Sequence, residues 1–180
     1  MGSWTLVERL AEATIGGTFN FYRDGEGAGL RRWRLRTYLD TRADAPILLV
    51  GEAAGYRGAR ISGIPFTSEH QLTGHGPAEA TATIVHAVLE ELGLEESVLF
   101  WNLVPTHPHE PGRPDSNRRP TRAEIEAGRP FLDELARGRT IVPVGRLAQE
   151  ILGGIYVRHP SHGGGIAFRD GLDAAFRSAR

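Results

Sequence analysis

Short apolar runs and longer helix-like stretches alternate along the chain. Four runs rich in apolar or β-branched residues lie close to turn-forming residues, which predicts buried strands at residues 46–50, 98–101, 140–144 and 155–158. Three other stretches space their apolar residues as helices do: residues 77–92, 121–137 and 146–152. Thr121 and Glu124 predict a capping box at the start of the second of these helices.

The alternation of strands and helices predicts an α/β fold. We expect a three-layer sandwich, with a central four-stranded parallel sheet and helices on both faces. A length of 180 residues with 40% hydrophobic content suits a single domain over residues 1–180. In such a sheet, functional groups gather beyond the carboxyl ends of the strands. The loops at residues 51–70, 102–120 and 159–165 are therefore the expected location of a site.

Composition and charge exclude several classes of chemistry. The net charge is −1 and the pI is about 6.7, so no overall positive field indicates a nucleic-acid partner. The absence of cysteine excludes disulfides, thiolate metal centres and cysteine nucleophiles. All 21 basic residues are arginine, so no lysine is present to form a Schiff base. The chain has no apolar run of membrane-spanning length and no export signal at its N-terminus, so we expect a soluble, cytoplasmic protein.

Residues 23–36 are rich in glycine and arginine. We interpret them as a loop followed by a short basic amphipathic stretch. Its arginines most simply form a solvated helix face, and the alternative is contact with backbone phosphates.

Chemically versatile groups follow three of the predicted strands. The small residues at 51–55 and 63–66 let backbone N–H groups approach a ligand closely, but no dinucleotide fingerprint or Walker lysine accompanies them. Asn102 ends the second strand with an amide that donates and accepts hydrogen bonds. His159 and Ser161 end the last strand with an imidazole and a hydroxyl.

In this order and on these strand ends, the motifs resemble those of the uracil-DNA glycosylase superfamily, and most closely its iron–sulfur branch. The first motif of that branch, Gly-Glu-Ala-Pro-Gly followed by Gly-Arg-Pro-Phe, is similar to residues 51–55 and 63–66 here. The middle motif is similar to Asn102 together with residues 117–121 and 129–131. Residues 141–146 resemble the third strand and helix start of the family, and residues 159–161, His-Pro-Ser, resemble its terminal motif. The likeness spans residues 46–165.

The resemblance implies a monofunctional glycosylase that excises uracil from DNA in base excision repair, without a cofactor. Phe66 would stack on the extruded base, Asn102 would hydrogen-bond its pyrimidine edge, and His159 would face its O2 oxygen. Backbone N–H groups near Ala53 and Gly55 would also bind the base. Donors aimed at the base oxygen stabilise the negative charge that develops on the leaving base.

The resemblance also implies a water-positioning group and contacts with DNA. In the best-known branch an aspartate stands one place after the position of Glu52, and this chain has Ala53 there. Glu52 is therefore the candidate for this catalytic role. Its alternative role is a hydrogen bond to the backbone of its loop. Ser161, His162, Arg57 and Arg158 are the candidates for contact with the DNA strand.

The chain departs from the family in two ways. Thr106 and Gly128 stand at two of the iron–sulfur cysteine positions, so we expect no cluster and no metal. The loop at 162–165 lacks the apolar wedge that fills the gap left by a flipped base, and for this reason we expect single-stranded or mismatched DNA as the partner. Separately, we expect the protein to be a monomer. Three residues further along are candidates to replace the wedge: Ile166, Phe168 and Arg169.

Three other interpretations remain open. The first is a glycosylase for another deaminated base, hypoxanthine or xanthine. The second is a relative that binds lesions without turnover. The third is a metal site formed by His107, His109 and Glu110, although the neighbouring prolines favour an ordered loop.

Overall fold

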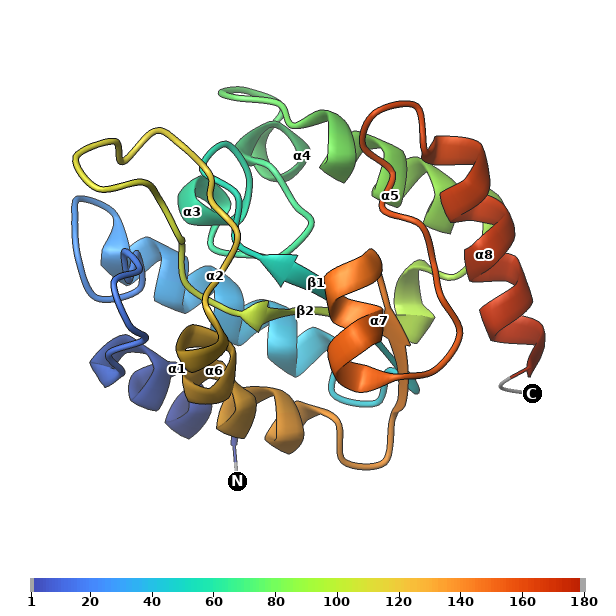
Figure 1. Ribbon diagram of the computed structural model, residues 1–180, viewed down its shortest axis with the longest axis horizontal. Helices are drawn as coiled ribbons and strands as arrows, with labels where there is room; N and C mark the ends of the chain where they lie inside the picture. Colours follow the sequence, from blue (N-terminus) through green and yellow to red (C-terminus); the bar gives the residue numbers. More distant parts are fainter. Residues whose placement is uncertain (1, 179–180) are drawn as a thin grey trace.

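A three-stranded parallel sheet lies at the centre of the molecule (Figure 1). The computed structural model describes residues 2–178. The strands are β1 (Ile47–Ala53), β2 (Val98–Val104) and β3 (Thr140–Pro143), in the spatial order β2-β1-β3. Three of the four predicted runs are confirmed as strands. Their parallel register brings their carboxyl ends to one edge of the sheet.

The prediction of a fourth strand at residues 155–158 is wrong. This segment forms one isolated parallel bridge, between Val157 and Val144. The N–H of Gly145 donates to the Val157 carbonyl at 2.8 Å, and the Val157 N–H donates to the Pro143 carbonyl at 3.3 Å. Glycines with positive φ angles at 153 and 154 turn the chain just before the bridge, and Pro160, which has no N–H, follows it. The ladder therefore stops after one residue.

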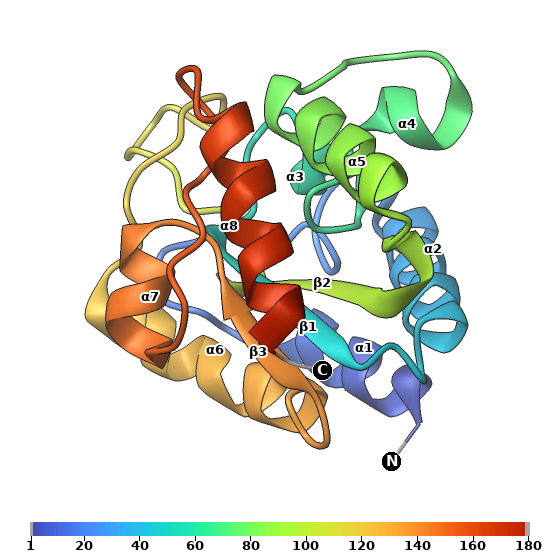
Figure 2. The ribbon, with the colours of Figure 1, turned by 90° about the vertical axis from the view of Figure 1, so that its right-hand side faces the viewer.

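Helices cover both faces of the sheet, as predicted (Figure 2). Leu48 and Val50 of β1 face a core formed with helices α1 (Ser3–Glu12), α2 (Ala28–Thr41), α6 (Arg122–Leu135) and α7 (Arg146–Leu152). Ile47 and Leu49, which alternate with them, face a second core with α5 (Ala80–Leu92) and α8 (Gly165–Ser178). This alternation follows from the two-residue period of a strand. Three short elements complete the fold: α3 (Ala59–Ser62), α4 (Glu69–Thr73) and the 3₁₀ turn Glu95–Ser97.

The three predicted helices are confirmed. Helix α7 has the predicted bounds, and α5 begins three residues later than predicted. The capping box of α6 is formed: the Glu124 N–H donates to the Thr121 hydroxyl at 3.2 Å, and the Glu124 carboxylate accepts from the Thr121 N–H at 2.8 Å. None of the described helices has the length and apolar character needed to cross a membrane.

Three arginines of α2 bind groups of the protein itself. Arg31 and Arg32 donate to backbone carbonyls at 2.6 Å each, and Arg34 binds both carboxylate oxygens of Glu69, at 2.7 and 2.9 Å. These contacts anchor the helix to the preceding loop and to α4. They favour neither a solvated helix face nor phosphate binding for these three side chains.

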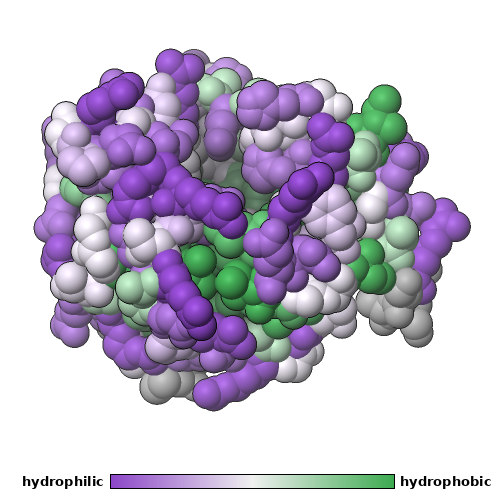
Figure 3. All heavy atoms as spheres, in the orientation of Figure 1, coloured by the Kyte–Doolittle hydropathy of each residue, from purple (hydrophilic) through white to green (hydrophobic). Residues whose placement is uncertain are grey.

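On the face shown in Figure 3, hydrophilic residues surround an apolar centre.

Candidate functional site

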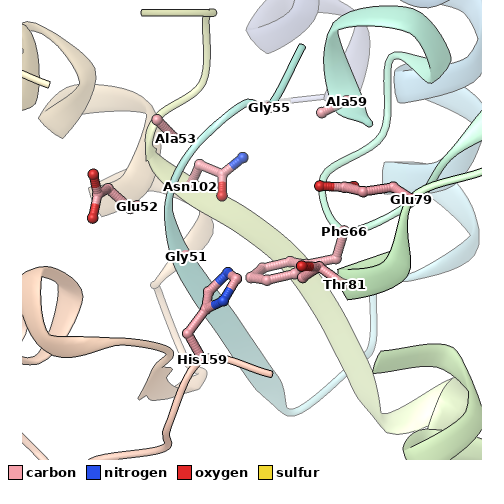
Figure 4. A pocket seen from close by; sticks show the side chains of 10 residues that line it. All are labelled: Gly51, Glu52, Ala53, Gly55, Ala59, Phe66, Glu79, Thr81, Asn102 and His159. Atoms are coloured by element: carbon pink, nitrogen blue, oxygen red, sulfur yellow. The ribbon is translucent and has the colours of Figure 1, made fainter. Parts of the chain in front are cut away.

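A pocket opens at the carboxyl ends of the strands, where the sequence pattern predicts a site (Figure 4). The walls come from the end of β1, the loop after it, the start of α5, the middle of β2 and the segment before α8. The lining residues are Gly51, Glu52, Ala53, Gly55, Ala59, Phe66, Glu79, Thr81, Asn102 and His159. Seven of these residues belong to the first, middle and terminal motifs of the sequence.

Asn102 and Phe66 meet over Gly51. The parallel register pairs Gly51 with Asn102 on the neighbouring strand. A Cβ atom on Gly51 would lie 2.6 Å from the Phe66 ring and 2.7 Å from the Asn102 Oδ1 atom, so only glycine leaves room for both side chains. Asn102 is buried, and within residues 2–178 no group hydrogen-bonds its amide. The amide is therefore available to a ligand in the pocket.

The Phe66 ring is held by an unusual backbone. Phe66 has a φ angle of 53°, which is rare for an aromatic residue. The buried Ser62 hydroxyl holds the turn around it: it donates to the Thr67 carbonyl at 2.6 Å and accepts from the Ile64 N–H at 3.1 Å. The ring packs against Phe100 with 5.6 Å between the centroids. Phe66 is thereby fixed as one wall of the pocket, where a planar base can stack on it.

Glu52 is half-buried at the end of β1. Burial raises the pKa of its carboxyl, and the charge of Arg119 opposes that shift. In Figure 4 the carboxylate points away from Asn102 and Phe66. Glu52 therefore borders the pocket, but its carboxylate does not project into the space between those two side chains.

His159 presents one ring nitrogen to the pocket. Its Nδ1 atom lies 2.8 Å from the Ser161 hydroxyl and accepts from the Ser161 backbone N–H at 3.2 Å. Burial, followed by the nearby charge of His162, lowers the pKa of His159 and favours the neutral ring. Because Nδ1 accepts, the proton of the neutral ring is on Nε2. His159 is therefore a hydrogen-bond donor toward the pocket.

Two side chains of the second loop hold the first loop in place. The His107 Nδ1 atom lies 2.8 Å from the Ala54 carbonyl oxygen, and burial lowers the pKa of this histidine. Asn117 accepts the backbone N–H of Tyr56 at 3.0 Å. The backbone next to Ala53 and Gly55 is thus tied to the loop that follows β2.

The interpretation of His107, His109 and Glu110 as a metal site is not supported. The second nitrogen of the His107 ring lies 3.3 Å from the Pro114 carbonyl, so both ring nitrogens face backbone oxygens. Within the described part of the chain, no three histidine, aspartate or glutamate side chains are arranged to hold a metal ion.

The residues expected to contact DNA lie outside the pocket. Arg57, Arg158 and His162 are exposed and do not line it. The Arg57 guanidinium lies over the Tyr56 ring, 5.3 Å from its centroid. Ser161 binds the His159 ring, which gives it an intramolecular role that the sequence did not indicate.

One of the three wedge candidates is exposed. Phe168 is fully buried in the core under α8, and Arg169 forms an ion pair with Glu91 at 2.7 Å. Ile166, in the first turn of α8, is 79% exposed. Among these candidates, only Ile166 has an apolar side chain that is free to enter a base stack.

Three pocket residues, Ala59, Glu79 and Thr81, lie outside the motifs, and Glu79 and Thr81 also lie outside the loops expected to hold the site. Glu79 is the N-cap of α5, and Thr81 is in its first turn. A glutamate is a poor N-cap residue, and its place near the start of a predicted helix was the one available signal. Their proximity to Phe66 depends on the path of residues 67–78, which no local pattern specifies.

Comparisons with known proteins agree with this architecture. A family model described as the Uracil DNA glycosylase superfamily matches residues 39–173. The crystal structure of wild-type SMUG2 from Pedobacter heparinus is similar, with a TM-score of 0.68 and 14% sequence identity, over 99% of this chain and 98% of that chain. A search of curated proteins finds no match. Superfamily members are DNA glycosylases, hydrolases that act on DNA in base excision repair. Because the family model matches well over half of its length, this chain belongs to the uracil DNA glycosylase superfamily.

Proposed function

We propose that this protein is a monofunctional DNA glycosylase that hydrolyses the N-glycosidic bond of uracil in DNA. The observation that carries the proposal is the meeting of Phe66, Asn102 and His159 around one pocket. An aromatic face, an amide and an imidazole donor are the groups that bind a planar base with polar edges.

The reaction needs the target nucleotide outside the base stack. Extrusion costs a few kcal/mol, and stacking on Phe66 with hydrogen bonds to Asn102 offsets part of this cost. As the glycosidic bond lengthens, negative charge develops on the base. The Nε2–H group of His159 donates to a base oxygen and stabilises that charge more in the transition state than in the ground state.

Water then attacks the sugar carbon from which the base departs. We assign to Glu52 the role of orienting this water, with its carboxylate at the edge of the pocket. Its outward direction suits a group that acts on the sugar rather than on the base. The chain has no lysine to trap the sugar aldehyde, so the proposed reaction ends at an abasic site without strand cleavage.

The test uses labelled oligonucleotides that carry one uracil, as single strands and in U:G and U:A duplexes. Abasic sites are cleaved with alkali after incubation with the wild type, Asn102→Ala, His159→Ala and, as a matched control, the exposed His70→Ala. We expect alkali-dependent cleavage by the wild type and the control, with rates about 100-fold lower for His159→Ala and strongly reduced for Asn102→Ala.

Absence of cleavage by folded wild-type protein in all three contexts would contradict the uracil assignment. Tight binding to the same oligonucleotides without base release would instead favour a lesion-binding relative. A single-stranded or mismatched substrate is expected to be preferred over U:A, because less energy is needed to extrude its base.

A further inference from the structure

His86 is a half-buried imidazole on α5 that does not line the pocket. Burial lowers its pKa; a hydrogen bond to the Phe66 backbone and the charge of Glu95 oppose this shift, and the charge of Arg42 adds to it. The net direction favours the neutral ring. An apolar side chain could fill the same space, so a polar ring is tolerated here only if it finds a hydrogen-bond partner.

That partner is the residue that follows Phe66. The Nε2 atom of His86 lies 3.1 Å from the Thr67 hydroxyl. This hydroxyl has one hydrogen, which it donates to the Pro65 carbonyl at 3.2 Å. Nε2 therefore carries the proton of the neutral ring and donates it to the Thr67 oxygen. Thr67 is buried, and within residues 2–178 no other side chain from outside residues 62–67 hydrogen-bonds it.

The turn that contains Phe66 needs support from other elements. Its φ angle of 53° is strained for an aromatic residue, and such a conformation persists only where the surrounding structure holds it. At the beginning of the turn, the Tyr22 hydroxyl donates to the Gly63 carbonyl at 2.8 Å. The hydrogen bond from His86 secures the other end, directly after Phe66.

His86 also packs against the ring that supports Phe66. Its imidazole lies edge-on to the Phe100 ring of β2, with 5.6 Å between the centroids. The Phe66 ring packs on the same Phe100 ring, also with 5.6 Å between the centroids. Helix α5 thus fixes Phe66 in two ways, through its backbone and through the ring beneath it.

We propose that His86 is a positioning residue, which holds the strained turn from α5 and so keeps the Phe66 ring where an extruded base stacks on it. This inference rests on the proposed glycosylase function of the pocket. His86 acts through Phe66 and makes no contact with the base itself.

The experiment combines substitutions at His86 with Phe66→Ala. Glutamine places an amide nitrogen as many bonds from Cβ as Nε2 of histidine, so His86→Gln can still donate to Thr67, whereas the shorter His86→Asn cannot reach it. The other proteins are the wild type, His86→Ala, the double variant with Phe66→Ala, and the control Glu90→Ala, which changes an exposed side chain on the same helix. Thermal unfolding checks that each variant is folded.

Two quantities are measured for each protein. The first is kcat/KM for uracil release from a single-stranded oligonucleotide. The second is the hydrogen-exchange rate of the Thr67 backbone amide, which donates to the Ile64 carbonyl at 3.3 Å within the turn and reports its opening.

We expect His86→Ala and His86→Asn to lose about fivefold in kcat/KM, as for one hydrogen bond, and His86→Gln to stay within about twofold of the wild type. Phe66→Ala should lose about 30-fold through lost stacking. Adding His86→Ala to it should change the rate less than about twofold, because the side chain that His86 positions is already gone. Exchange of the Thr67 amide should be about fivefold faster in His86→Ala and nearly unchanged in His86→Gln.

Three results would overturn the inference: a further fivefold loss in the double variant, a glutamine variant as impaired as the alanine variant, or unchanged Thr67 exchange in folded His86→Ala. A wild type that releases no base would contradict the proposed function itself. In that case the exchange rates still decide whether His86 holds the turn.

Discussion

Ser161 fixes the hydrogen-bonding state of His159. Its backbone N–H lies 3.2 Å from the Nδ1 atom and its hydroxyl 2.8 Å from the same atom. A backbone N–H can only donate, so Nδ1 is an acceptor and the proton of the neutral ring is left on Nε2. Two residues of one tight loop thus set which way the imidazole donates.

Substitution of Ser161 tests this relationship. Ser161→Ala removes the hydroxyl but keeps the backbone contact, so we expect kcat for uracil release to fall about three- to tenfold with little change in KM. Ser161→Thr retains a hydroxyl and should restore most of the rate. If the threonine and alanine variants behave alike, the hydroxyl does not position the ring.

Gly51→Ala should close the pocket without unfolding the protein. The added methyl group would meet the Phe66 ring at 2.6 Å and the Asn102 oxygen at 2.7 Å. We expect base release to fall at least 100-fold, because both of the side chains proposed to bind the base must move. Gly29→Ala is the matched control, since its Cβ would have no atom closer than 4.0 Å and the residue is in a helix. Retained activity in Gly51→Ala would place base binding elsewhere.

Ile166 is the residue expected to fill the gap left by an extruded base. Its side chain is 79% exposed in the first turn of α8. We expect Ile166→Ala to lower uracil release from duplex DNA about tenfold and to leave release from single strands nearly unchanged, since a single strand has no stack to repair. Parallel assays on the two substrates measure this ratio. An equal loss of activity on duplex and single-stranded DNA would contradict a wedge role for Ile166.

The ion pair between Glu124 and Arg118 should dominate the acid sensitivity of the fold. Glu124 is buried, contacts Arg118 at 2.6 Å and caps α6, and these contacts lower its pKa to about 2. Since the unfolded carboxyl titrates near a pKa of about 4.3, the stabilisation is complete above that pH and is lost as the pH falls through about 2.

Glu124→Gln should therefore lower the free energy of unfolding by about 3 kcal/mol at pH 7, measured by urea titration. The difference from the wild type should shrink between about pH 5 and pH 2. Glu126→Gln, on the exposed side of the same helix, is the control and should cost less than about 0.5 kcal/mol. A constant difference across this pH range would contradict the assignment.

Much of the site could be predicted because its residues belong to strand ends. The apolar runs identified the three strands, and parallel strands carry their following residues to the same edge. Gly51 and Asn102 could be grouped in this way from their positions along the chain alone, whereas His159 follows residues 155–158, which form a single bridge and no strand. Phe66 was identified through a motif and not through its position on a strand.

The rest depended on contacts that no local pattern encodes. Residues 155–158 have the composition of a strand, but they make one bridge because the turn before them and Pro160 after them end the ladder. Phe168 was a candidate wedge, and the packing of α8 buries it completely. The sequence by itself determined the α/β class, the three strands of the sheet and the absence of amine and thiol chemistry, since these follow from periodicity and residue type. Only the tertiary structure decided that Glu79 enters the pocket, that Glu52 points outward and that Ser161 orients His159, because each depends on how loops of unspecified path pack together.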